Sequence, residues 1–191
     1  MERIVAATTH GRCLVIPAEI SGPAPILGGF HGYGEDAETQ LERLRAIPGS
    51  SRWHCISIQG LHRFYERRTN RVVASWMTRQ NRELAIADNI AYVSNCIEQL
   101  AAEWPVQPKI VFAGFSQGVG MAFRAAVSLQ KGPAGVIAVG GDIPPEIGPE
   151  ALANVSAAMV ARGATDPWYS GAKFATDQKR LTEAGASVHA L

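Results

Sequence analysis

The chain has 191 residues, of which 47% are hydrophobic and 18% are charged. This length and composition are typical of one globular domain that buries roughly 70% of its unfolded surface, and they exclude a disordered chain. Eighteen Lys and Arg residues against seventeen Asp and Glu residues give a net charge of +1. That balance excludes the basic surface of a nucleic-acid-binding or polybasic membrane protein. We therefore treat residues 1–191 as a single domain.

The amino terminus and the cysteines predict a cytoplasmic protein. The first ten residues turn polar before an export signal could develop, and no run approaches the ~20 apolar residues of a membrane span. Cys13, Cys55 and Cys96 are an odd number at unpatterned spacing, each within an apolar segment. We expect three free, packed thiols, with a reactive thiol as the alternative.

Short apolar segments alternate with longer helical patterns, an order typical of an α/β fold with a mostly parallel sheet and helices on both faces. The pattern predicts about eight strands, at 4–7, 12–17, 25–30, 53–59, 109–114, 134–139, 157–161 and 187–191. The first two should pair antiparallel through a turn at His10-Gly11. Helices are predicted at 36–46, 82–104, 117–129 and 170–184.

The strand at 109–114 runs directly into Gly114-Phe115-Ser116-Gln117-Gly118 and then into a helical pattern. This G-x-S-x-G arrangement holds a serine at the tip of a strained strand-to-helix turn, so that its hydroxyl projects above the sheet. The pattern alone would arise by chance in roughly one in ten such chains, so its place between strand and helix matters more. Ser116 is the candidate nucleophile, and a plain glycine-rich turn is the alternative.

A glycine-rich loop, residues 28–36, follows the strand at 25–30. Stabilising an oxyanion requires backbone N–H donors fixed where the negative charge develops. We expect one donor to be the N–H of Tyr33 and the other that of Gln117, the residue after the nucleophile. His31 is then a structural residue that ties the loop. The alternative is an ordinary turn before a helix.

Asp166 follows the strand at 157–161, and Pro167 prevents that strand from continuing. In the serine, acid, histidine order of this kind of fold, such an acid orients the catalytic imidazole. A helix-capping role for Asp166 is the competing interpretation.

Together these segments resemble the phospholipase/carboxylesterase family of α/β-hydrolases, which includes the acyl-protein thioesterases. His31 to Glu35 is similar to the family's H-G-x-G loop, residues 114–118 to its nucleophile elbow, and residues 163–169 to its acid turn. The resemblance implies hydrolysis of a small-molecule ester or thioester through an acyl-enzyme, with no metal and no organic cofactor. It leaves the acyl chain, the alcohol and the oligomeric state undefined.

The catalytic base is missing from this pattern. Only His189 follows Asp166, and it lies within the last predicted strand, whereas the family's catalytic His sits in the loop after that strand. We therefore expect the chain to lack its His loop and last helix, with a catalytically crippled relative as the alternative.

Two hypotheses follow. The first is a serine hydrolase that cleaves carboxylic esters, thioesters or lysophospholipids. The second is an inactive binding protein on the same fold. A phosphate-binding loop is disfavoured because no nucleotide-binding glycine pattern occurs.

Residues 61–80 contain several arginines close to aromatic residues, and they are either a solvated face or a border of the active site. In the second case Phe64 and Trp76 would line the substrate.

Overall fold

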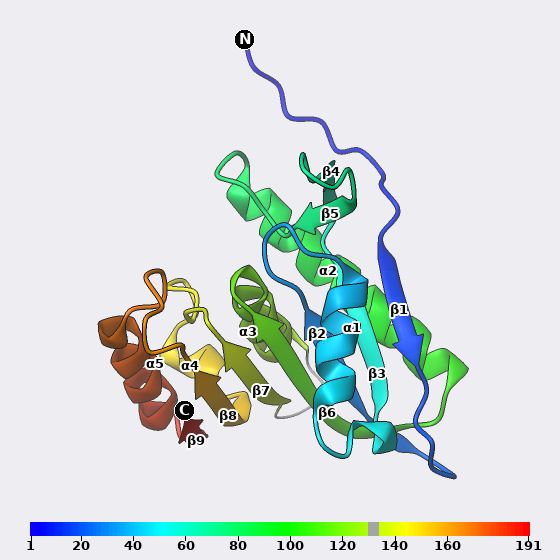
Figure 1. The fold of residues 1–191 in the computed structure, drawn as a ribbon, viewed down its shortest axis with the longest axis vertical. Coiled ribbons are helices and arrows are strands. Elements are labelled where there is room, and N and C mark those ends of the chain that lie inside the picture. Colours follow the sequence, from blue (N-terminus) through cyan, green and yellow to red (C-terminus); the bar gives the residue numbers. More distant parts are fainter. Residues whose placement is uncertain (130–133) are drawn as a thin grey trace.

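The computed structural model describes residues 1–129 and 134–191, and within them seven strands form one mixed sheet (Figure 1). Its order is β1-β3-β2-β6-β7-β8-β9; β1 is antiparallel to β3 and every other neighbouring pair is parallel. The mostly parallel α/β sheet is therefore confirmed. The strands are β1 Arg12–Ile16, β2 Ala24–Phe30, β3 His54–Gln59, β6 Val106–Phe115, β7 Ala134–Val139, β8 Val155–Ala161 and β9 Ser187–Ala190.

Helices cover both faces of the sheet, because alternate residues of the parallel strands are apolar on both sides. On one face, Leu44 of α1 (Ala37–Ala46) packs with Leu27, Cys55 and Ala113. On the other face lies the larger core, which receives α2 (Arg82–Glu103), α3 (Gln117–Ser128) and α5 (Gly171–Glu183). Two short elements, η1 (Ser50–Arg52) and α4 (Pro149–Leu152), complete the helices of the described residues.

The predicted pairing of 4–7 with 12–17 is wrong. Residues 1–11 form no regular element, and β1 pairs with β3 instead. Ile4 and Val5 are 61% and 80% exposed, so a strand there would bury little apolar surface.

Residues 61–80 contain a hairpin that the sequence pattern did not predict. β4 (His62–Tyr65) pairs antiparallel with β5 (Val72–Ser75), outside the main sheet. Ala74 of β5 forms a bridge to Glu35, which joins this hairpin to the loop after β2.

The cysteines are free, as expected: Cys55 and Cys96 are buried and Cys13 is half-buried. Burial raises the pKa of the Cys55 thiol. In the described part of the chain, no helix is long and apolar enough to cross a bilayer.

Candidate active site

Ser116 lies between β6 and α3, at the carboxyl ends of the parallel strands. Its backbone angles are φ 50° and ψ −118°, a conformation that is costly for a residue with a side chain. The Ser116 N–H donates to the carbonyl of Val139 at 2.9 Å, which ties the turn to β7. The predicted strand-turn-helix context of Ser116 is therefore present.

The two glycines of the motif allow chains to pass at distances that a side chain would prevent. A Cβ on Gly114 would stand 2.5 Å from the carbonyl oxygen of Gly118. A Cβ on Gly118 would stand 2.1 Å from that of Phe30, the last residue of β2. Gly118 thus brings the loop after β2 against the first turn of α3.

The Tyr33 N–H of the loop after β2 has no hydrogen-bond partner in the described part of the chain, whereas its two neighbours do. The Gly32 N–H donates to Glu35 Oε2 at 2.7 Å and the Gly34 N–H donates to the Ala74 carbonyl at 3.0 Å. Between them, the Tyr33 N–H has no acceptor among the described residues. Gln117 opens α3, where the first N–H groups have no partner within the helix. Both expected oxyanion donors are therefore available to a ligand.

An ion pair holds this loop against the elbow. Arg43 of α1 bonds both carboxylate oxygens of Glu35, at 2.6 and 2.7 Å, and its guanidinium lies 4.2 Å from the centre of the Phe115 ring. Burial opposes ionisation of Glu35, but Arg43 and the Gly32 N–H hold the pKa of the carboxyl below its ordinary value. Glu35 thus stays charged and fixes Gly32, the neighbour of Tyr33.

His31 is completely buried and has a structural role, as expected. The Gly60 N–H donates to Nε2 at 2.9 Å, so Nδ1 carries the proton that is donated to the Gly32 carbonyl at 2.7 Å. Burial lowers the pKa of the imidazole. A neutral ring with both nitrogens engaged cannot serve Ser116 as a base.

Trp76 departs from the expectation that it lines the substrate, because its side chain has no exposed surface. Its ring packs edge-on against Phe30, with the ring centres 5.4 Å apart, and its Nε1–H donates to the His31 carbonyl at 2.8 Å. The Gln117 side chain accepts from the Trp76 N–H at 3.0 Å and donates to the Met77 carbonyl at 3.1 Å. Trp76 and Met77, which follow β5, therefore connect the loop after β2 to the first turn of α3 through hydrogen bonds.

Phe64 lies on the surface of the hairpin, beside the same loop. It is 36% exposed, and its ring centre is 5.5 Å from that of Tyr33, which is 65% exposed. The two rings present an apolar surface next to the Tyr33 N–H.

Asp166 lies in the turn after β8. Its Oδ1 accepts from the N–H groups of Trp168 and Tyr169 at 2.9 and 3.0 Å, and these bonds lower the pKa of the carboxyl. Its Oδ2 lies 3.6 Å from where a Cβ on Gly140 would stand, and Gly140 lines a pocket at Ser116. The carboxylate is therefore ionised, and its Oδ2 lies beside Gly140.

Two pockets reach Ser116, with volumes of about 270 and 300 Å³. The first is lined by Met77, Arg82, Ser116, Gln117, Gly120, Arg124, Asp142, Pro144 and Pro145. The second is lined by Ser116, Gln117, Gly140, Gly141, Asp142, Trp168, Tyr169 and Lys173. The sequence reasoning missed Arg124, Trp168 and Lys173; the available signal was an arginine within the apolar run of α3.

Neither pocket is lined by a histidine. His189 pairs in register with Met159 inside β9, so it lies within the sheet and not in a loop at the serine's edge. Among the residues described here, no group of three or more His, Cys, Asp and Glu side chains is arranged to hold a metal ion.

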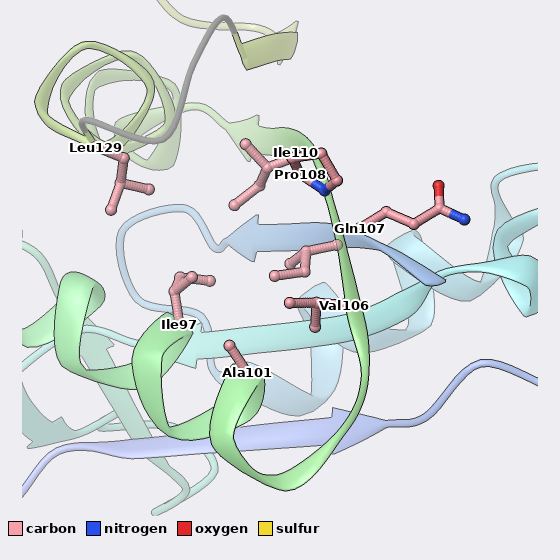
Figure 2. A pocket seen from close by; sticks show the side chains of 8 residues that line it. Ile97, Ala101, Val106, Gln107, Pro108, Ile110 and Leu129 are labelled. Atoms are coloured by element: carbon pink, nitrogen blue, oxygen red, sulfur yellow. The ribbon is translucent and has the colours of Figure 1, made fainter. Parts of the chain in front are cut away.

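A separate apolar pocket of about 420 Å³ lies at the beginning of β6, the end opposite to Ser116. Figure 2 shows Ile97 and Ala101 of α2 facing Val106 of β6, with Leu129 beyond them at the end of α3. Gln107 points away, and its amide donates to the Pro23 carbonyl at 2.7 Å. Nothing in this lining offers chemistry on an ester.

Comparisons with known proteins agree on one family. The family model described as Phospholipase/Carboxylesterase matches residues 13–186. The Bacillus cereus carboxylesterase has 17% identity and a TM-score of 0.70, with 95% of this chain and 84% of that chain covered. A phospholipase/carboxylesterase from Dyadobacter fermentans has 17% identity and a TM-score of 0.70, covering 97% and 88%. Zea mays acyl-protein thioesterase 2 has 16% identity and a TM-score of 0.64, covering 95% and 90%. No curated protein matches the chain significantly.

Proposed function

The chain belongs to the phospholipase/carboxylesterase family and is a hydrolase of that type, and we propose that Ser116 is its nucleophile toward carboxylic esters or thioesters. The observation that carries this proposal is the strained elbow at Ser116, and the N–H groups of Tyr33 and Gln117, which have no acceptor among the described residues, support it. Strain at a functional residue persists only where the surrounding structure imposes it.

In the proposed reaction, Ser116 Oγ attacks the carbonyl carbon and loses its proton to a base. The Tyr33 and Gln117 N–H groups donate to the oxygen that becomes negative, and the α3 N-terminus favours the same charge. The alcohol or thiol leaves with a proton, and water then releases the acyl group from Ser116. Asp166 orients the base, and Phe64 with Tyr33 contacts the substrate outside the reacting centre.

The base of this mechanism is not assigned to any of the five histidines. His31 is buried with both nitrogens engaged, and none of the others lines a pocket at Ser116.

The second candidate is a binding protein on the same fold, and it is favoured by the observation that, among the described residues, no histidine lines a pocket at Ser116. A fluorophosphonate probe separates the two, since it reacts with an activated serine. With imidazole added as the base, we expect labelling that Ser116→Ala abolishes and that Ser187→Ala, at an exposed position of β9, leaves unchanged. Absence of labelling, together with no hydrolysis of p-nitrophenyl acetate, would favour the binding protein.

The free thiols of Cys13, Cys55 and Cys96 support a cytoplasmic location.

A further inference from the structure

Arg124 of α3 is a buried cation with one nitrogen that lacks a strong acceptor. The residue is 5% exposed. Its Nε donates to Glu146 Oε1 at 3.0 Å, and its Nη2 bonds the same carboxylate. Its Nη1 reaches no oxygen in the described part of the chain, and its acceptor is Met77 Sδ at 4.0 Å. A thioether is a weak acceptor, so the protein satisfies the Nη1 donor only weakly.

This nitrogen faces the pocket that holds the nucleophile. A Cβ on Gly120 would stand 3.1 Å from Arg124 Nη1 and 3.5 Å from Pro144, and all three residues line that pocket with Ser116. Gly120 follows Ser116 by four residues, which is about 6 Å along a helix. Because Gly120 has no side chain, the space between the serine and the guanidinium is open.

The charges around the pocket leave an excess of positive charge. Glu146 is shared by Arg124 and by Arg82, whose Nη2 lies 3.8 Å from it. Asp142 pairs with Lys173 at 3.0 Å. Among the charged side chains that line the pocket itself, two are cations, Arg82 and Arg124, and one is a carboxylate, Asp142, which suits an anionic ligand.

We propose that Arg124 binds a carboxylate carried by the substrate about one helical turn from the scissile carbonyl. One carboxylate oxygen accepts the Nη1–H, while Nε and Nη2 remain on Glu146. The substrates that fit are half-esters of short dicarboxylic acids. Their placement as substrates rests on the proposed function of Ser116, whereas the anion site does not.

The test measures binding to the Ser116→Ala chain, in which esters remain intact. Isothermal titration compares the monomethyl esters of succinic, glutaric and adipic acid with the corresponding neutral dimethyl esters. A hydrogen bond between charged groups predicts that at least one monoester binds between about tenfold and a hundredfold tighter than its diester. Arg124→Met should abolish this preference and Arg124→Lys should keep part of it. Arg52→Met removes a charge at η1, at the opposite end of the sheet, and should leave the preference unchanged.

Gly120→Ala provides a second variant that keeps Arg124, and alanine favours a helix more than glycine does. Its methyl group would enter the space before Arg124 and should weaken the monoesters more than the diesters. Equal affinity for monoesters and diesters, or a preference that survives both Arg124→Met and Gly120→Ala, would overturn the anion site. Fluorophosphonate labelling of the unmodified chain, with imidazole added as the base, tests Ser116 separately. A preference without labelling would therefore refute the proposed function and retain the site.

Discussion

The ion pair between Glu35 and Arg43 gives the sharpest test of how the oxyanion loop is held. Glu35→Gln keeps the shape of the side chain and an acceptor for the Gly32 N–H, but removes the charge that Arg43 binds at two oxygens. The guanidinium would then lose its anchor beside Phe115. We expect the loop segment around Tyr33 to become less well fixed.

The magnitude follows from the exposure of the pair. The Arg43 and Glu35 side chains are 36% and 22% exposed, so solvent screens part of their attraction. A contribution of about 1 kcal/mol is expected, which for a chain of this size lowers the Tm by about 2–4 °C. Complete loss of an oxyanion donor costs about a hundredfold to a thousandfold in kcat. Because the Gln amide still accepts from Gly32, we expect about a tenfold loss of serine reactivity.

Glu38→Gln is the matched control. Glu38 lies on α1, the helix that carries Arg43. Its carboxylate accepts from Arg12 at 2.5 and 3.0 Å, away from the loop after β2. Thermal unfolding and the rate of fluorophosphonate labelling are measured for both variants. If the two variants lose the same Tm and neither loses reactivity, the Glu35 pair contributes to stability alone, and its role in positioning Tyr33 is refuted.

Three further predictions concern the base, the loop and the hairpin. Imidazole added to the 191-residue chain should raise its rate of p-nitrophenyl acetate hydrolysis above the rate of Ser116→Ala under the same conditions. His189→Ala should not change this rise. A loss of the rise in His189→Ala would identify His189 as the base. Burial lowers the pKa of His31 in the folded chain. As the pH falls below about 6.5, the unfolded chain therefore gains a proton that the folded chain does not. The free energy of unfolding declines until the pH reaches the pKa of His31 in the folded chain. The Tm should therefore fall between about pH 7 and pH 5, and a slope that is no smaller in His31→Gln would contradict this. Trp76→Ala should cost about 3–5 kcal/mol of stability and lower the rates on all acyl lengths by one factor, whereas Phe64→Ala should change the ratio of long to short esters. A changed ratio in Trp76→Ala would restore it as a lining residue.

The elbow and the sheet could be predicted because their signals are local. A buried parallel strand is a continuous apolar run, and the tight turn at Ser116 requires glycine at two fixed positions. The failed strand at 4–7 shows the limit of such signals. Its apolar residues match a strand pattern, but the structure provides no face to bury them, and this depends on the fold as a whole.

Residues 61–80 were ambiguous for a related reason. Aromatic side chains serve equally in a core and at a binding surface, and composition does not distinguish the two uses. Trp76 proves to be core because the chain after β5 packs behind the loop after β2, whereas Phe64 of β4 lies on the surface beside Tyr33 of that loop. That packing depends on long-range contacts, such as the bridge between Ala74 and Glu35, which no spacing in the sequence encodes.

The segment that follows β5 also gives the side chain of Gln117 a structural role. The sequence reasoning used only its backbone N–H, but its side chain joins Trp76 and Met77 to the first turn of α3. Trp76 in turn donates to His31, whose ring holds Gly60 and Gly32. The N–H groups of Tyr33 and Gln117 therefore belong to one hydrogen-bonded framework built on buried residues. Preorganised donors stabilise a developing charge because they need not reorient during the reaction. Buried residues such as Trp76 and His31 can thus act on catalysis through the positions of these donors, without touching the substrate.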